Sequence, residues 1–152
     1  MPDLCQTLVA VANPVLKLDE LWSFVLKRAG KRWIWIALCR QTCQVVAFVV
    51  GDRSAQTCRR LWQAIPDGYR LAQCYTDFWE AYAKALPAAQ HVAVGKESGQ
   101  TAHVERWNLT LRQRLARFVR RTLSFSKSEK MHEACLRLFI QRYNCSHALT
   151  LL

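Results

Sequence analysis

The C-terminal part of the sequence places a single carboxylate among many arginines. From Glu105 to the C-terminus there are three acidic residues, Glu105, Glu129 and Glu133, against ten lysines and arginines. A basic excess of this size is typical of a surface that meets a polyanion such as nucleic acid. One acid kept within such a surface is suited to holding a divalent metal ion against a phosphate group. Glu105 is therefore the first candidate for metal-dependent phosphate chemistry.

Two further acids complete a candidate metal-binding set. Asp19 lies in an alternating, strand-like stretch, and Asp77 directly follows another strand-like stretch. Carboxylate oxygens are the hard ligands that Mg²⁺ prefers, and two such ions together can activate the attacking oxygen and stabilise the leaving oxygen in phosphoryl transfer. Each acid alone is more often a surface residue or a helix cap, and Glu20 is an equally polar neighbour of Asp19. The hypothesis therefore depends on the convergence of all three acids.

The stretch that carries Glu105 predicts one long helix with three faces. Apolar residues spaced by three and four predict a buried face that extends from Val104 to Thr122. Asn108 and Arg112 fall within about 60° of Glu105, and Arg112 is about two turns, or roughly 10 Å, along the axis. The third face collects the arginines 106, 114, 117, 120 and 121. Solubility is usually served by mixed charges, so five arginines without an acid weaken the alternative of a merely solvated face.

The elements that must position these acids are predicted in the order βββ-α-β-α-β-α. Alternation predicts a strand at residues 18–26, and β-prone runs predict strands at 33–39 and 44–50. Ser54 is suited to cap a helix that Pro66 ends. Strands at 71–76 and 91–94 flank a short helix at 78–86. A last helix is predicted at 126–142, with four residues facing inward: Met131, Cys135, Leu138 and Phe139.

This order predicts an α/β fold with a ribonuclease-H-like core, in which an α+β mixed sheet has helices on both sides and further helices follow at the C-terminus. In such a sheet the first and fourth strands are neighbours, which would bring Asp19, Asp77 and Glu105 to one edge of the core. The 152 residues, of which 51% are hydrophobic, fit one globular domain, here residues 18–152. Residues 1–17 are expected to form a poorly ordered lead-in.

Composition also limits the partners. The net charge of +11 favours nucleic acid or an anionic surface. No apolar run reaches the length of a membrane span, and the first twelve residues lack the basic start of a secretory signal. The seven cysteines are odd in number and scattered, which indicates reduced thiols. We therefore expect a cytoplasmic protein without a membrane partner.

Four ordered blocks of sequence carry a family resemblance. They are Leu18-Asp-Glu-Leu-Trp-Ser-Phe-Val25, Tyr75-Thr-Asp-Phe-Trp-Glu-Ala-Tyr82, His103-Val-Glu-Arg-Trp-Asn-Leu-Thr-Leu-Arg-Gln-Arg114 and Arg120-Arg-Thr-Leu-Ser-Phe-Ser-Lys-Ser128. Together they resemble the catalytic part, encoded by the downstream reading frame, of an insertion-sequence-one family transposase. That family is part of the acid-triad (DDE) transposase and retroviral-integrase superfamily. The resemblance covers residues 18–143.

The resemblance implies that Asp19, Asp77 and Glu105 are the catalytic, metal-binding triad, with Mg²⁺ or Mn²⁺ as the cofactor. It also implies that Arg112 stands where the superfamily often has a basic residue that contacts transposon-end DNA. The full set of implied DNA-binding residues is Asn108, Arg112, Arg106, Arg114, Arg117, Arg120, Arg121 and Lys127. The implied reaction is nicking at an element end, followed by attack of the freed 3′-hydroxyl on target DNA. Neither step needs a protein nucleophile.

Active members of that family also carry an N-terminal zinc-binding and helix-turn-helix region, often supplied by frameshifting from an upstream reading frame. Nothing in residues 1–17 resembles it. The expected partners are transposon-end and target DNA, an upstream-frame end-binding domain joined by fusion, and further copies of the chain in a DNA-dependent homo-oligomer, all at the bacterial nucleoid. The alternative hypothesis is a catalytically inactive DNA-binding or regulatory product that lacks the end-recognition domain.

Overall fold

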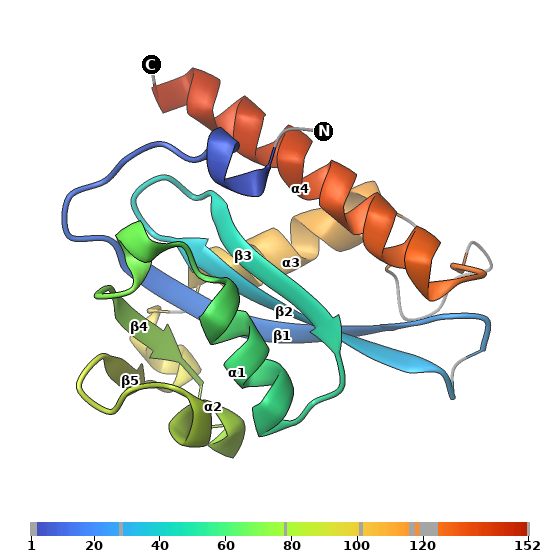
Figure 1. Ribbon diagram of the computed structural model, residues 1–152, viewed down its shortest axis with the longest axis horizontal. Helices are drawn as coiled ribbons and strands as arrows, with labels where there is room; N and C mark the ends of the chain where they lie inside the picture. Colours follow the sequence, from blue (N-terminus) through green and yellow to red (C-terminus); the bar gives the residue numbers. More distant parts are fainter. Residues whose placement is uncertain are drawn as a thin grey trace.

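The computed structural model describes residues 3–27, 29–77, 79–100, 102–115, 118 and 125–151. Figure 1 shows a five-stranded sheet in the order β3-β2-β1-β4-β5. The strands are β1 (Val15–Phe24), β2 (Lys31–Cys39), β3 (Val45–Gly51), β4 (Gln73–Thr76) and β5 (His91–Ala93). The first three strands pair in antiparallel fashion, whereas β4 runs parallel to both β1 and β5. This is the predicted mixed sheet of a ribonuclease-H-like fold, with β1 and β4 as neighbours.

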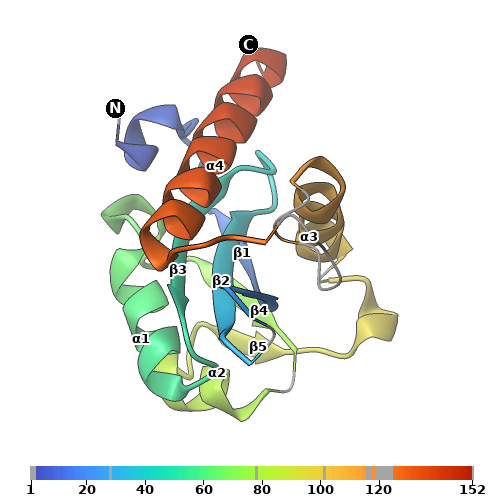
Figure 2. The same ribbon diagram turned by 90° about the vertical axis from the view of Figure 1, so that its right-hand side faces the viewer.

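Helices cover both faces of this sheet. They are α1 (Ala55–Ala64), α2 (Glu80–Ala85), α3 (Ala102–Arg114) and α4 (Glu129–Leu151), with short 3-10 turns η1 (Leu4–Thr7), η2 (Asp67–Tyr69) and η3 (Lys96–Ser98). Figure 2 shows α1 on one side of the sheet and α3 on the other. No helix in the described part of the chain combines the length and apolar character that crossing a bilayer requires.

Two hydrophobic cores hold the layers together, one on each face of the sheet. β2 contributes to both, because alternate residues of a strand point to opposite faces. Trp35 packs with α1 and α2 in the first core, whereas Ile36 packs with α3 and α4 in the second. A continuous apolar run such as residues 33–39 is what a strand buried on both faces requires.

The start of α1 follows the prediction from sequence. The Ser54 hydroxyl accepts a hydrogen bond from the backbone N–H of Thr57 at 3.3 Å, which satisfies one of the unpaired donors of the first turn. The helix ends at Ala64, two residues before Pro66. Because α1 is held at both ends, its buried residues Cys58 and Leu61 stay in register with the sheet.

The arginine-rich helix is shorter than predicted. α3 ends at Arg114, whereas the spacing of apolar residues predicted a helix as far as Thr122. Phe118 nevertheless lies in the α3-side core, and its backbone N–H bonds to the carbonyl of Leu115 at 3.1 Å, the spacing of a tight turn. The apolar spacing therefore placed Phe118 correctly in the core, although the helix ends before it. Thr122 lies outside the described residues.

The last helix is longer than predicted, and its buried face was predicted only in part: Cys135 and Phe139 are half-buried against the α3-side core, but the other two residues are not. Met131 and Leu138 are 55% and 44% exposed, and the fully buried line is instead His132, Leu136, Ile140 and Asn144. A prediction from hydrophobicity alone misses this buried line, because two of its four residues, His132 and Asn144, are polar. His132 contacts the hydroxyls of Ser23 and Ser126, each at 2.6 Å. Asn144 bonds to the backbone of β3 through both its amide oxygen and its amide nitrogen, at 2.8 Å each.

The N-terminal segment packs against the domain. β1 begins at Val15, so the last three residues of the predicted lead-in pair with β4. Leu4 is buried in the core between the sheet, α3 and α4. Figure 1 shows η1 beside the C-terminal half of α4.

Candidate active site

Strand β1 directs Asp19 toward α3. Lys17, Asp19, Leu21 and Ser23 share one face of the strand, and Leu21 lies in the α3-side core. The amide nitrogen of Asn108, on α3, donates a hydrogen bond to Asp19 Oδ2 at 2.7 Å. Strand alternation therefore places this carboxylate at the junction of the sheet and the helix.

The register of the parallel pair places Asp77 beside Asp19. Lys17 of β1 is the partner of Tyr75 of β4. Two residues farther along each chain stand Asp19 and Asp77. The backbone N–H of Trp79 donates to Asp77 Oδ1 at 2.9 Å, which orients this carboxylate at the end of β4. The pairing of β1 with β4 thus brings these two acids together at the carboxyl end of β4, as predicted.

Glu20 is the third acid of the described cluster, but it has other partners. Ligand oxygens of Asp19, Glu20 and Asp77 all lie within 4.8 Å of one another. Glu20 Oε1 accepts from Arg53 at 2.8 Å, and Glu20 Oε2 accepts from the Tyr82 hydroxyl at 2.5 Å. The Arg53 guanidinium lies against the indole rings of Trp33 and Trp79, at 4.7 and 4.1 Å from the ring centres. Both oxygens of Glu20 therefore serve the packing of α1 and α2 on the sheet.

Sequence reasoning missed the structural role of Glu20, although the sequence holds a signal for it. Glu20 follows Leu16 and Leu18 on the face of β1 that packs against α1 and α2. An acid on an apolar line must find a cationic or hydrogen-bonding partner, since burying an unpaired charge is costly. Glu20 thus differs from Asp19 despite being its neighbour in sequence.

Helix α3 brings Glu105 to the same region. Glu105 is exposed and lies one turn before Asn108, which contacts Asp19. Its charge contributes to the raised pKa of Asp19. Arg112, one turn after Asn108, is half-buried. Of the predicted line, Asn108 contacts Asp19 directly, and Glu105 acts on Asp19 through its charge but is not among the carboxylates that lie within 4.8 Å of one another.

Burial and the neighbouring carboxylates raise the proton affinity of Asp19. Burial, followed by the charges of Glu20, Asp77 and Glu105, raises the pKa of Asp19 to about 7. Lys17, on the same strand face, donates to Gln100 at 3.0 Å and lies over the Tyr75 ring rather than pairing with a carboxylate in the described residues. Burial lowers the pKa of Lys17 to about 8. Lys17 therefore does not neutralise Asp19, whereas Arg53 is engaged by Glu20.

The amide of Asn108 leaves one polar atom without a partner. Asn108 is 7% exposed, and its Oδ1 accepts no hydrogen bond among the described residues. A buried carbonyl oxygen without a donor is costly. An oxygen atom in this position, next to clustered carboxylates, fits the ligand preference of a hard divalent cation.

The predicted DNA-binding arginines are only partly described. Arg106 and Arg114 are exposed on α3, and Lys127 is exposed just before α4. Arg117, Arg120 and Arg121 lie outside the described residues. These three basic residues lie on α3 or just before α4, on the α3 side of the sheet.

Comparison with known proteins identifies the family. The sequence model described as IS1 transposase matches residues 13–145. The chain is 36% identical over 129 residues to the insertion element iso-IS1n protein InsB of Shigella dysenteriae, which covers 85% of this chain and 95% of that protein. It is 38% identical over 117 residues to the insertion element IS1 protein InsB of Shigella flexneri, covering 77% and 86%. The same identity and length relate it to the insertion element IS1 4 protein InsB of Escherichia coli K12, covering 77% and 68%. The chain therefore belongs to the IS1 transposase family.

Proposed function

We propose that this chain is the catalytic domain of a DNA transposase that nicks DNA at insertion-element ends and joins the freed 3′-hydroxyl to target DNA, using Mg²⁺ or Mn²⁺ held by Asp19, Asp77 and Glu105. The observation that carries the proposal is the strand register that sets Asp19 beside Asp77, with ligand oxygens within 4.8 Å. The third ligand is supported by the hydrogen bond that ties α3 to Asp19 through Asn108, and by the effect of the Glu105 charge on Asp19.

The residues present fit a divalent metal ion. Repulsion among the carboxylates and burial disfavour the charged form of Asp19, and a bound cation would relieve both effects. The Asn108 oxygen is a further hard donor at the same place. Glu20 is excluded from the proposed ligand set because Arg53 and Tyr82 occupy both of its oxygens. When bound, the ion supplies charge stabilisation for the phosphodiester and activation of the attacking oxygen.

The protein's own groups have separate tasks in this proposal. Asn108 orients Asp19 through its amide N–H. Arg112, on the same line of α3, would contact transposon-end DNA close to the metal. The exposed guanidinium groups of Arg106 and Arg114 would bind backbone phosphates, which are recognised mainly by charge. Further phosphates along the DNA would be bound by Arg117, Arg120, Arg121 and Lys127.

The proposal includes partners that the domain needs for specificity. An end-binding domain supplied by the upstream reading frame would recognise the element ends, and the fused protein would act as a DNA-dependent homo-oligomer at the bacterial nucleoid. Sequence specificity in protein–DNA complexes comes from contacts to base edges and from DNA shape, rather than from phosphate contacts. The basic side chains described here are therefore assigned to DNA backbone binding.

Strand transfer by a fusion protein tests the proposal. An end-binding domain from a relative is fused to this chain, and Mg²⁺-dependent joining of end DNA to a target plasmid is measured. The wild-type fusion should join DNA, and Glu105→Gln should lower the rate by at least about a hundredfold. Glu80→Gln, an exposed acid on α2, is the matched control and should retain full activity.

Equal activity of Glu105→Gln and the wild-type fusion would refute the triad. A fusion that binds end DNA without any metal-dependent cleavage would instead support the alternative, a DNA-binding or regulatory product without catalytic activity.

A further inference from the structure

A cavity of about 200 Å³ lies between α3, α4 and the turn that joins β2 to β3. Its lining includes Arg106, Trp107, Thr110 and Arg114 from α3 and Tyr143 and His147 from α4. The described residues that line it include no carboxylate. A cavity with two arginines and no acid is electrostatically suited to an anion.

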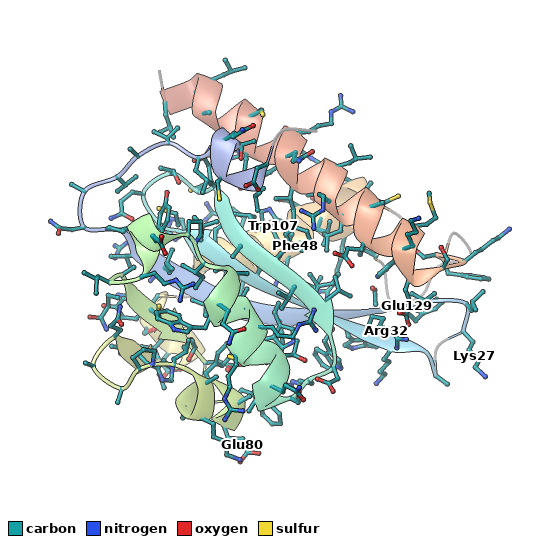
Figure 3. The ribbon with its side chains drawn as sticks, viewed as in Figure 1. Lys27, Arg32, Phe48, Glu80, Trp107 and Glu129 are labelled. Atoms are coloured by element: carbon teal, nitrogen blue, oxygen red, sulfur yellow. The ribbon has the colours of Figure 1, made fainter. Side chains whose placement is uncertain are left out.

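One residue that lines this cavity carries a hydrogen-bond donor without an acceptor in the described part of the chain. Trp107 is 1% exposed, and its indole N–H has no hydrogen-bond partner among the described residues. Figure 3 marks Trp107, which packs in the core beneath α4 together with Phe48. A buried indole N–H normally finds a partner, and leaving it without one costs about 1–3 kcal/mol. This unpaired donor is an observation independent of the arginine charges.

The α4 side of the cavity also presents a donor, the Tyr143 hydroxyl. Burial raises the pKa of Tyr143 to about 12, so its hydroxyl keeps its proton at neutral pH. His147 donates from Nδ1 to the carbonyl of Tyr143 at 3.1 Å, and the two rings lie 4.1 Å apart. This contact fixes the histidine ring against the tyrosine at the cavity. A phosphate oxygen could therefore meet donors from both helices.

The cavity is separate from the acidic site. At 100° per residue, Arg106, Thr110 and Arg114 lie between about 100° and 180° around α3 from Glu105, whereas Asn108 and Arg112 lie within about 60° of it. The two sites are therefore on opposite sides of one helix, about 10 Å apart, which is the diameter of a helix with its side chains. That span corresponds to about three base-pair steps along the axis of a DNA duplex, at about 3.4 Å each.

We propose that this cavity is a binding site for a phosphate group of the DNA backbone, on the opposite side of α3 from the acidic cluster. Its volume is below the roughly 300–1,000 Å³ of pockets that enclose a drug-sized ligand. It is therefore suited to a single anionic group rather than to a whole nucleotide. A phosphate held here fixes the direction in which the strand crosses α3. The inference rests on the proposed function for the identity of its ligand.

Nuclear magnetic resonance of the indole N–H groups tests this site in the full chain without divalent metal. Trp107→Phe assigns the Trp107 resonance, and the wild-type chain is titrated with a short DNA duplex and, separately, with inorganic phosphate. The duplex should shift the Trp107 resonance. Arg106→Gln and Arg114→Gln should each lose this shift, weaken duplex binding severalfold and lower the slope of log affinity against log salt by about 1. Arg59→Gln, an exposed arginine on α1 across the sheet, is the matched control and should change neither the shift nor the binding.

The titrations distinguish the possible ligands. A Trp107 shift with phosphate but not with duplex would overturn the assignment to the DNA backbone. No shift with either ligand, or equal losses in Arg114→Gln and Arg59→Gln, would overturn the site itself. Because these measurements need neither metal nor cleavage, they can fail while the proposed nicking reaction holds, and the reverse is equally possible.

Discussion

Replacing Asp19 by asparagine should stabilise the fold at pH 8 while removing a proposed metal ligand. The substitution keeps the shape of the side chain and an oxygen that can accept from Asn108, but it removes the charge. Burial and neighbouring carboxylates raise the pKa of Asp19 from 3.8 to about 7. Because the folded-state pKa is the higher one, the folded protein binds this proton more tightly. Stability is therefore greatest below about pH 4 and falls as the pH rises toward 7.

The size of the effect follows from the two pKa values. A difference of about three pH units corresponds to about 4 kcal/mol of destabilisation by the charged form above pH 7. The hydrogen bond to Asn108 becomes weaker when its acceptor is uncharged, which lowers the gain in stability by about 1 kcal/mol. The expected gain for Asp19→Asn is thus about 3 kcal/mol at pH 8, or roughly 6–12 °C in Tm for a chain of this length.

Urea and thermal unfolding in metal-free buffer between pH 4 and pH 8 measure this effect as the difference between the variant and wild type. The difference should be largest at pH 8 and disappear near pH 4. Added Mg²⁺ should raise the Tm of the wild type, since a ligand that binds only the folded state stabilises it, and should raise the Tm of Asp19→Asn much less. A variant less stable than wild type at pH 8, or a difference independent of pH, would refute this reasoning.

Three further changes test the packing around the site by denaturant unfolding. Arg53→Met should cost about 3 kcal/mol, because it leaves the buried carboxylate of Glu20 without its cation, and a loss below about 0.5 kcal/mol would contradict that role. Leu111→Ala, at a fully buried position, should cost about 2–5 kcal/mol, whereas Leu109→Ala, 55% exposed on the same helix, should cost less than about 0.5 kcal/mol; similar losses would contradict the assigned helix face. Asn144→Ala should cost about 3 kcal/mol because it leaves backbone groups of β3 unpaired, and an unchanged unfolding midpoint would show that water replaces the amide.

The sheet and the approach of Asp19 to Asp77 could be predicted because they depend on patterns that the sequence displays. Alternating and β-prone runs set the order of strands, and that order makes β1 and β4 neighbours. The register that aligns the two acids depends instead on long-range pairing of residues about 58 positions apart, which no local pattern encodes. The order of the strands therefore predicted that Asp19 and Asp77 approach each other, but it did not predict the pairing register that aligns them.

Polar burial explains the errors on the helices. The buried face of α4 contains His132 and Asn144, which bond to Ser23 and Val45 at separations of 109 and 99 residues, so hydrophobicity favoured Met131 and Leu138 instead. The role of Glu20 was missed for the same reason, because its partner Arg53 is 33 residues away in the sequence. Buried polar residues are specified by partners that only the folded chain brings together.

Calorimetric titration of the chain with Mn²⁺ tests the central claim, that Asp19, Asp77 and Glu105 hold a divalent metal ion. Asp77→Asn and Glu105→Gln should each weaken Mn²⁺ binding by at least about tenfold, and Glu80→Gln should bind as the wild type does. Wild-type affinity in both Asp77→Asn and Glu105→Gln would contradict the account.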